Sequence, residues 1–301
     1  MTDTAQRQAA RRAAGKTSVQ AAAPATLLDG RKTAERIVGQ VAEKLAAAGG
    51  PDVTLATVLV GAHAPSRLYV NLKLKMAARG GLKTRLVELP GDVAQRTLEQ
   101  TVRELAADDS VHGILLQLPL PDAVDAGALI DLIPAAKDVD GLTAENLGRL
   151  LRGKPHLVPC TPLGVMRLME QYDIPTQGRK AVVIGRSHLV GLPQVMLLAL
   201  RGVDATVTLC HSKTKDIEAV CQGADILVAA AGMPELVRRS FVKPGAAVFD
   251  VGVTRRNGKI VGDVAFDEVS EVAGAITPMP GGTGPMTVAC LIENTLKAAG
   301  V

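Results

Sequence analysis

The sequence predicts an α/β protein of two domains, each built on a parallel sheet. Short apolar segments alternate with amphipathic helical segments from about residue 30 onward, which is the pattern of βαβ units. The alternation restarts after Gly178, where a strand leads into a glycine-containing turn and then a helix. With 301 residues, the chain is long enough for two such domains.

The first half of the chain alternates helices and strands. Apolar residues at helical spacing predict two of its helices: Ile37, Val41 and Leu45, ended by Gly49-Gly50, and Leu98, Val102 and Leu105. Apolar runs predict the strands between the helices: residues 54–60, 84–88 and 113–118.

The helix after the first of these strands carries Tyr69 and Lys73 on one face, because residues four apart lie one turn above each other. Ser66 is the expected N-cap and Gly80-Gly81 the expected end. An apolar stripe beside this face is expected to anchor the helix in a core: Leu68, Leu72 and Met76. Taken alone, the pair is compatible with an ordinary surface helix and also with a site in which a phenol and an amine act together.

Polar side chains follow the strand of residues 113–118. Gln117 stands at the carboxyl end of this apolar strand, where open parallel sheets bind ligands, although a loop-capping glutamine is the alternative. Asp138 and Asp140 then flank a valine before Gly141. A calcium loop would need a glutamate at its twelfth position, which is Arg149 here, so we reject calcium. A turn-forming aspartate and a carboxylate aimed at a ligand both remain open.

The second half repeats the βα alternation. Thr161 can cap a helix whose first turn holds Pro162. Asn257-Gly258 predicts a hairpin. The predicted strands are residues 180–184, 205–209, 225–229 and 246–251, and the predicted helices start near residues 194 and 214. A last helix is expected to pack back on the first domain through Val288, Leu291, Ile292 and Leu296.

A dinucleotide site is predicted where the strand of residues 180–184 ends. The order strand, glycine turn and helix suits a pyrophosphate, although Gly185-x-Ser187-x-x-x-Gly191 is a weak match to the common fingerprint. The next strand ends in Cys210-His211-Ser212-Lys213, without the acid that holds a ribose 2′-hydroxyl in NAD-preferring domains. A hydroxyl, a cation and Arg186 favour a 2′-phosphate, and therefore NADP.

Composition excludes several classes of protein. The net charge of +4 is small and partly located in the first residues, so no nucleic-acid surface is predicted. No apolar run reaches the ~18 residues of a membrane helix. The four cysteines lack CxxC spacing and are expected to be reduced thiols of a cytoplasmic protein: Cys160, Cys210, Cys221 and Cys290. Residues 1–26 resemble a transit peptide in composition, but a disordered extension is the prediction.

Seven motifs occur in a characteristic order: Tyr69-Val70-x-x-Lys73-x-Lys75, residues 113–121 (GILLQLPLP), 137–141 (KDVDG), 159–162 (PCTP), 183–187 (VIGRS), 250–252 (DVG) and 280–289 (PGGTGPMTVA). In this order they resemble methylenetetrahydrofolate dehydrogenase/cyclohydrolase, from about Leu27 to the C-terminus. The departures are Thr283, where valine is common, and Val253-Thr254, where Ile-Asn is common.

The resemblance implies oxidation of 5,10-methylenetetrahydrofolate with NADP and hydrolysis of the methenyl product to 10-formyltetrahydrofolate. It implies tetrahydrofolate derivatives as substrates, a homodimer, and no metal. It also implies a folate-binding catalytic domain of residues 27–160 plus 286–301 and an NADP-binding Rossmann domain of residues 161–285.

The resemblance also assigns residues to the site. Lys73 is the implied catalytic lysine, Gln117 its partner, Asp140 the pterin ligand, and Tyr69 a wall of the site. The implied substrate-binding residues are Tyr69, Lys73, Leu116, Gln117, Leu118, Asp140, Pro280, Gly281 and Gly282. The candidate dinucleotide contacts are Thr161, Gly185, Arg186, Ser187, His211, Ser212 and Val253.

Other interpretations explain less of the sequence. Short-chain dehydrogenases also carry Tyr-x-x-x-Lys, but their glycine turn precedes that pair, whereas here it follows. A dehydrogenase of the shikimate or amino-acid type explains the domain order without explaining residues 117–121, 138–141 and 280–287 together. A monofunctional folate enzyme, or a binding module that uses the arginine-rich first residues, are further alternatives.

Overall fold

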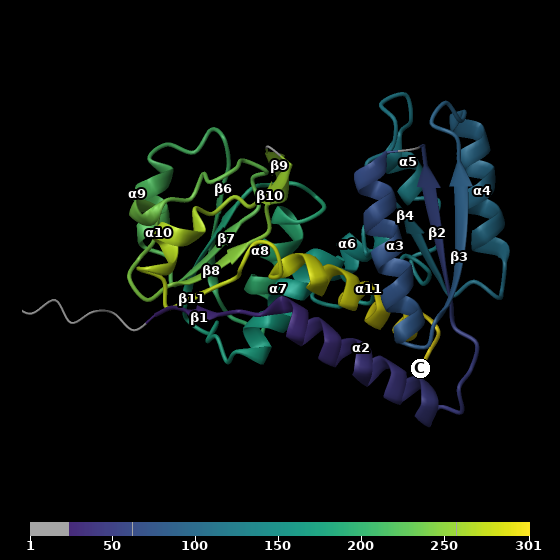
Figure 1. Ribbon diagram of the computed structural model, residues 1–301, viewed down its shortest axis with the longest axis horizontal. Helices are drawn as coiled ribbons and strands as arrows, with labels where there is room; N and C mark the ends of the chain where they lie inside the picture. The colour runs from purple at the N-terminus through teal and green to yellow at the C-terminus, as the bar shows by residue number, and fades with distance from the viewer. Residues whose placement is uncertain (1–23, 62, 257) are drawn as a thin grey trace, which may run out of the picture.

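The computed structural model describes residues 24–61, 63–256 and 258–301, which form two parallel sheets connected by long helices (Figure 1). The smaller sheet has the order β3-β2-β4, with strands Lys83–Leu89, Thr54–Val60 and Gly113–Leu116. The larger sheet has the order β1-β11-β8-β7-β5-β6, with strands Thr26–Leu27, Ala275–Ile276, Ala247–Asp250, Ile226–Ala229, Lys180–Ile184 and Thr206–Cys210. The predicted α/β class with two parallel sheets is confirmed.

The helices lie between the strands in sequence. The longer ones are α2 (Gly30–Ala47), α3 (Ala64–Arg79), α4 (Gln95–Ala107), α7 (Cys160–Gln171) and α11 (Thr283–Ala298). The shorter ones are α5 (Ala126–Ile130), α6 (Ala144–Leu151), α8 (Gly191–Ala199), α9 (Ile217–Gln222), a 3₁₀ turn at Arg239–Phe241, and α10 (Phe266–Ser270).

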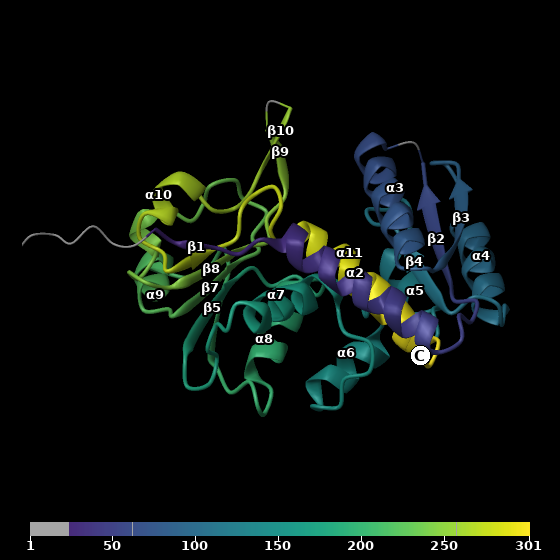
Figure 2. The ribbon, with the colours of Figure 1, turned by 60° about the horizontal axis from the view of Figure 1, so that its bottom comes forward.

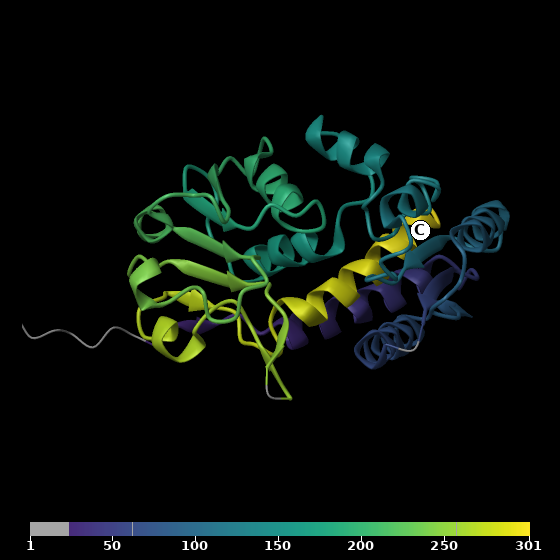
Figure 3. The same ribbon diagram turned by 90° about the horizontal axis from the view of Figure 1, so that it is seen from above.

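One apolar cluster contains buried residues of both sheets and of α2, α7 and α11, and each sheet has a further cluster of its own. α2 and α11 lie side by side and run from the larger sheet to the smaller one (Figures 2 and 3). Their buried faces carry the residues predicted from helical spacing, and α7 packs against α11. The last helix therefore packs on the first domain, as expected, and a rigid frame of helices holds the two sheets together.

The carboxyl ends of the larger sheet's strands form the predicted ligand edge. β5 pairs with β6 on one side and with β7 on the other, so the strand order reverses at β5. Open α/β sheets bind ligands outside the strand ends at such a reversal. The turns after β5, β7 and β8 all lie at this edge.

The Tyr69 helix differs from its prediction in two respects. His63 occupies the N-cap position of α3, and Ser66 lies in the first turn, where its hydroxyl contacts the His63 ring. The predicted stripe is not the buried face, because Leu68 is 61% exposed and Leu72 44% exposed. Val70, Lys73 and Ala77 are buried instead. The helix is therefore anchored along the face that carries the lysine.

Three smaller predictions concern the cap of α7, the hairpin and the first residues of the chain. Pro159, not Thr161, precedes α7 as its N-cap residue, and the Thr161 hydroxyl contacts the Thr287 hydroxyl at 3.0 Å. The predicted hairpin is present as β9 (Thr254–Arg256) paired with β10 (Lys259–Val261), although Asn257 lies outside the described residues. Most of the predicted extension also lies outside them. Thr26 and Leu27 form strand β1 in the larger sheet, which no sequence pattern predicted.

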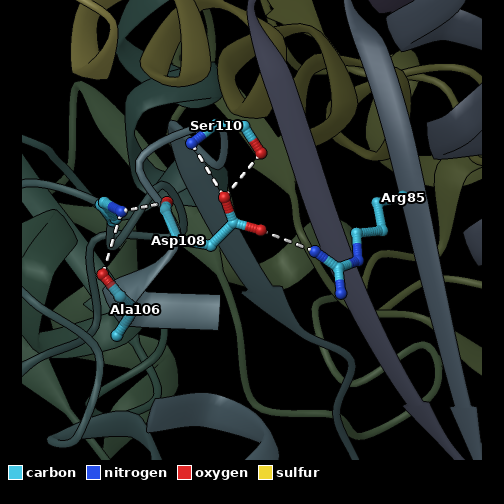
Figure 4. Close-up of polar contacts among 5 residues, drawn as sticks. Arg85, Ala106, Asp108 and Ser110 are labelled. Atoms are coloured by element: carbon cyan, nitrogen blue, oxygen red, sulfur yellow. Dashed lines mark hydrogen bonds and ion pairs between the residues drawn. The ribbon is translucent and has the colours of Figure 1, made fainter. Parts of the chain in front are cut away.

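The turn between α4 and β4 holds the segment that carries Asp138 and Asp140 in place. The Asp108 carboxylate accepts hydrogen bonds from Ser110 and Arg85, which hold the pKa of this carboxyl below its usual range (Figure 4). The Lys137 ammonium donates to the carbonyls of Ala106 (3.0 Å) and Asp108 (2.8 Å). Because Ile114 N also donates to Lys137 O, the residues after Lys137 are fixed alongside β4.

Asn294 on α11 is predicted to stabilise the fold through buried backbone groups. Its side-chain amide donates to Val139 O and Val158 O, each at 2.9 Å, and the residue is 3% exposed. Asn294→Ala leaves these buried acceptors without that donor, so the free energy of unfolding should fall by about 3 kcal/mol. Urea denaturation measures this loss. Asn71→Ala, at an exposed position on α3, is the control, and an equal effect of the two substitutions would contradict the interpretation.

Candidate active site

Lys73 and Gln117 form a buried polar pair between α3 and the end of β4. The Lys73 amine lies 3.0 Å from Gln117 Oε1, and the two residues are 5% and 7% exposed. The Gln117 amide nitrogen donates to Leu118 O at 2.5 Å, which fixes the side-chain orientation and presents the oxygen to the lysine. The pair therefore combines a desolvated amine with an uncharged acceptor.

Tyr69 lies one helical turn before Lys73 and covers it. The lysine nitrogen is 4.6 Å from the centre of the phenol ring, within the range of a cation–π contact. Burial raises the pKa of the Tyr69 hydroxyl, and the nearby Asp140 carboxylate raises it further. A phenol with a raised pKa is a poor proton donor, so this environment suits Tyr69 as a wall of the site.

The pKa of Lys73 is lowered, mainly because burial disfavours the ammonium form. The Asp140 carboxylate acts in the opposite direction and partly offsets this effect. Burial also raises the pKa of Asp140, while the lysine lowers it. The net result of these opposing influences is a Lys73 pKa below that of a solvated lysine.

The two aspartates after Lys137 have different environments. Asp138 is 1% exposed, and its carboxylate accepts hydrogen bonds from Gly141 N, Thr143 N and the Asn146 amide. It organises the turn. Asp140 is half-buried and borders a cavity beside Lys73. The structure thus gives the turn-forming role to one aspartate and leaves the other facing open space.

We call this space the lysine cavity. It has a volume of about 260 Å³ and lies between the two sheets. It brings together seven of the predicted site residues: Tyr69, Lys73, Leu116, Gln117, Leu118, Asp140 and Thr161. It also contains residues that the sequence reasoning did not assign to the site: Leu142, Cys160, Leu189, Val190 and Thr287. Leu189 and Val190 belong to the predicted dinucleotide turn, so that turn reaches the lysine.

A second space, which we call the hairpin cavity, adjoins the other side of Tyr69. It has a volume of about 520 Å³ and a mostly apolar lining that includes Leu72, Met76 and Ile260. Val253, Pro280 and Gly281 of the predicted site line it as well. Its charged residues were not predicted: Arg31, Glu35, Lys75 and Arg79. Lys75 was part of a quoted motif, but nothing in its spacing indicated a cavity.

Gly282 lines neither cavity. A Cβ atom added to Gly30 would overlap the Gly282 carbonyl, which shows how closely this loop packs on the start of α2. Arg31 N also donates to Gly281 O at 3.1 Å. The predicted 280–282 segment is therefore divided: Pro280 and Gly281 face the hairpin cavity, whereas Gly282 packs against the protein.

The turn after β5 fits a dinucleotide. Gly185 has a φ of 117°, and a Cβ atom there would overlap the carbonyl of Ala230. Gly191 opens α8 so close to Gly185 that a Cβ would overlap its carbonyl. Ser187 Oγ accepts from Val190 N, which shapes the turn. A glycine turn at the start of a helix of this kind can hold a pyrophosphate.

The end of β6 lies beside this turn. Gly185 N donates to Cys210 O at 2.8 Å, so the residues after Cys210 stand next to the glycine turn. Arg186, Ser212 and Lys213 are exposed, and His211 is half-buried, its ring accepting from Lys213 N. The absence of a carboxylate in this short segment supports a phosphate at the ribose 2′ position.

In the part of the chain that the structure describes, no group of three or more His, Cys, Asp or Glu side chains is placed to hold an ion. Among residues 24–61, 63–256 and 258–301, no helix is both long and apolar enough to cross a membrane.

Family models match both parts of the chain. The model of the tetrahydrofolate dehydrogenase/cyclohydrolase catalytic domain matches residues 28–140. The model of the NAD(P)-binding domain of the same family matches residues 159–301.

Individual relatives agree with the models. The bifunctional protein FolD 2 of Frankia alni is 48% identical over 278 residues, which cover 91% of this chain and 96% of the relative. The bifunctional protein FolD of Rhodopirellula baltica is 45% identical over 292 residues, with 92% and 97% covered.

Solved structures are similar over the same length. The FolD methylenetetrahydrofolate dehydrogenase/cyclohydrolase of Campylobacter jejuni superposes with a TM-score of 0.88 at 43% identity, covering 91% of this chain and 98% of the other. The Trypanosoma brucei enzyme, solved with NADP and an inhibitor, gives a TM-score of 0.87 at 40% identity, with 92% and 97% covered. The chain belongs to the tetrahydrofolate dehydrogenase/cyclohydrolase family.

Proposed function

We propose that this protein oxidises 5,10-methylenetetrahydrofolate with NADP and then hydrolyses 5,10-methenyltetrahydrofolate to 10-formyltetrahydrofolate, as a bifunctional enzyme of one-carbon folate metabolism. The observation that carries this proposal is the lysine cavity, where a desolvated amine, an uncharged acceptor and a half-buried carboxylate meet residues of the dinucleotide turn. One cavity thus combines the groups needed for a proton-dependent step and for a hydride-dependent step.

The pterin ring of the folate fits beside Asp140. A carboxylate can accept from the adjacent donors of the amino-pyrimidine edge, and Leu116, Leu118 and Leu142 supply apolar walls. Tyr69 separates the lysine cavity from the hairpin cavity and borders both. In this orientation the p-aminobenzoyl-glutamate part of the folate extends into the hairpin cavity, whose apolar lining suits the ring. Arg31, Lys75 and Arg79 suit the carboxylates.

The oxidation step needs positioning rather than an acid or a base. Bound NADP would supply the hydride acceptor for the one-carbon bridge. The protein's part is to hold the folate against Tyr69 and Asp140 and to exclude water with the apolar side chains around them. Leu189 and Val190 connect the dinucleotide turn to this arrangement.

The hydrolysis step assigns a proton-carrying role to Lys73. Water adds to the methenyl carbon and loses a proton, which the neutral amine accepts. The ammonium then returns a proton to N5 of the pterin as the bond between N5 and the bridging carbon breaks, and the formyl group stays on N10. A solvated lysine with a pKa near ~10.4 would hold its proton too firmly for this exchange, so the lowered pKa of Lys73 is required.

Gln117 orients the lysine without fixing its protonation state. Its oxygen accepts from the amine in either the charged or the neutral form. A carboxylate at this position would favour the ammonium and raise the lysine pKa. The neutral amide therefore preserves the proton exchange that the hydrolysis needs.

The dinucleotide lies along the carboxyl edge of the larger sheet in this proposal. Gly185, Ser187 and the start of α8 hold its pyrophosphate, and Val253 contacts its nicotinamide end. Arg186 and Ser212, with His211 beside them, recognise the 2′-phosphate. Thr161, whose hydroxyl contacts Thr287, borders the cavity where nicotinamide and folate meet.

We also propose the division into a folate-binding domain, residues 27–160 plus 286–301, and a dinucleotide-binding domain, residues 161–285. Strand β1 places Thr26 and Leu27 in the larger sheet, so the first boundary of this division moves from residue 27 to residue 28. A homodimer is proposed from the family resemblance alone. A cytoplasmic location is supported by the buried, unpaired state of all four cysteines.

Replacing the lysine should separate the two activities. Lys73→Met keeps most of the buried, unbranched side chain and removes the proton carrier, so cyclohydrolase activity should fall by at least about 10²-fold. Dehydrogenase activity should persist, because hydride transfer does not use the amine. Absorbance assays of methenyltetrahydrofolate and NADPH in one reaction measure both. Lys44→Met, exposed on α2, is the control, and full hydrolysis by Lys73→Met would exclude the assignment.

The pH profile should report the influence of Asp140 on the lysine. The carboxylate raises the Lys73 pKa, so Asp140→Asn lowers it further. Because the neutral amine is the active form, cyclohydrolase activity rises with pH through this pKa. The acid limb of the normalised profile should therefore move to lower pH in the variant, even though folate binding weakens. A limb that moved to higher pH would contradict the proposed coupling.

Cofactor preference should depend on Arg186. Arg186→Gln removes a charged partner of the 2′-phosphate, so the KM for NADP should rise about tenfold or more, while the KM for NAD changes little. Initial rates with each dinucleotide give the ratio. Arg201→Gln, exposed after α8 on the same domain, is the matched control. Equal changes with NADP and NAD would show that Arg186 does not read the phosphate.

A further inference from the structure

Two buried carboxylates in the larger domain have no part in the proposed chemistry. Asp250 ends strand β8 and is 2% exposed, and Asp263 follows the β9–β10 hairpin and is 0% exposed. Within the described residues, neither carboxylate has an ion-pair partner, and their hydrogen bonds all come from backbone amides. Buried carboxylates are costly unless hydrogen bonds satisfy them, so this arrangement calls for an explanation.

Asp250 closes the base of the hairpin. Its Oδ1 accepts from Gly252 N at 3.0 Å and from Asp263 N at 2.9 Å, and its Oδ2 accepts from Val264 N at 3.0 Å. Gly252 lies just before the hairpin, whereas Asp263 and Val264 lie just after it. One carboxylate thus ties the outgoing and returning segments together and uses both of its oxygens.

Asp263 extends this connection to the neighbouring turn. Its Oδ2 accepts from Ala231 N at 2.6 Å and from Gly232 N at 2.8 Å. These two amides belong to the turn after β7. Asp263 Oδ1 is buried without a hydrogen-bond partner. The two aspartates therefore act in series: the backbone amide of Asp263 donates to Asp250, and its side chain accepts from the next turn.

Two glycines make room for the carboxylates. A Cβ atom on Gly252 would overlap the Asp263 carboxyl group, and a Cβ atom on Gly262 would overlap that of Asp250. Backbone and carboxylate approach each other this closely only because no side chain intervenes. The Asp250 and Asp263 side chains therefore pack closely against the backbone of the segments that they hold.

The turns after β7 and β8 stand at the carboxyl edge of the sheet, beside the glycine turn after β5. A Cβ on Gly185 would overlap Ala230 O, which places the β7 turn directly against the glycine turn. Val253 follows the β8 turn, is 63% exposed, and lines the hairpin cavity together with Tyr69. In the proposed function, the turn after β5 holds the pyrophosphate and Val253 contacts the nicotinamide end, so the β7 turn lies directly beside the one and the β8 turn carries the other.

We propose that Asp250 and Asp263 are positioning residues for the nicotinamide end of the dinucleotide, because they fix the β7 turn, the β8 turn and Val253 relative to one another. This inference rests on the proposed function. It assigns no contact with substrate to either residue. Burial raises the pKa of Asp250 to about 6, and its backbone amide donors act in the opposite direction.

Comparing the two activities of each variant tests this role, because only the dehydrogenase uses the dinucleotide. Asp263→Ala removes the acceptor of the Ala231 and Gly232 amides. We expect the Kd for NADP, measured by calorimetry, to rise at least tenfold, while cyclohydrolase kcat stays within about twofold. Asp263→Asn keeps one oxygen for these amides and places its NH₂ group at the unpaired Oδ1 position. We expect it to recover most of the affinity lost in Asp263→Ala.

Asp250→Asn should not show this recovery. Both oxygens of Asp250 accept backbone amides, so an NH₂ group at either position faces a donor. We expect weaker NADP binding and lower dehydrogenase kcat/KM, with cyclohydrolase retained. Asp267→Asn, exposed on α10, is the control for removal of a charge.

The results that would overturn the positioning role differ from the one that would contradict the proposed function. Equal loss of both activities in Asp263→Ala, or unchanged NADP affinity in both Asp263→Ala and Asp250→Asn, would overturn the positioning role. If Asp250→Asn does not fold, the contrast between Asp263→Ala and Asp263→Asn still decides the question. An unmodified enzyme without either activity would instead contradict the proposed function.

Discussion

The contact between Lys73 and Gln117 is the constraint on which the rest of the site depends. It requires an amine to be buried where its charged form is disfavoured, next to an acceptor that adds no charge of its own. The surrounding structure meets both conditions. α3 buries its lysine face, β4 ends so that Gln117 projects toward it, and Leu118 O fixes the glutamine's orientation. Asp140 then limits how far the lysine pKa falls.

The fold supports this contact by fixing each participant from a different direction. Lys137 anchors the start of the aspartate segment, Asp138 shapes its turn, and Asn294 holds Val139 O from the last helix. The dinucleotide turn reaches the same cavity through Val190. A reaction that needs a folate and a dinucleotide together is thus located between the two sheets. The helices α2 and α11 connect these sheets (Figure 2).

Much of the fold could be predicted because its elements follow simple periods. Leu98, Val102 and Leu105 recur at helical spacing and are all buried, and the strand of residues 54–60 has the bounds expected from its apolar run. The prediction failed for the buried face of α3, because Leu68 and Leu72 are as apolar as core residues yet are exposed. A buried lysine is rare, so hydrophobicity alone could not identify the buried face. β1 was missed for a different reason. A strand of only two residues exists because of its pairing with another strand, here Ala275 and Ile276, which lie far away in the sequence.

The site could be predicted to the extent that single residues stand in recognisable motifs. Tyr69, Lys73, Gln117 and Asp140 meet in one cavity, as the resemblance implied. Leu142, Arg31 and Asp263 could not be found in this way, because their roles arise from contacts between segments that no spacing rule connects.

The position of α11 has a consequence for local opening of the protein. Residues 283–298 pack against α2, α3, α7 and β4. If α11 detaches, Val139 O and Val158 O lose their Asn294 donor and the apolar faces of α2 and α7 lose their cover. Thr287 of the same helix lines the lysine cavity. The cavity therefore exists only while α11 is docked, however stable the smaller sheet is by itself.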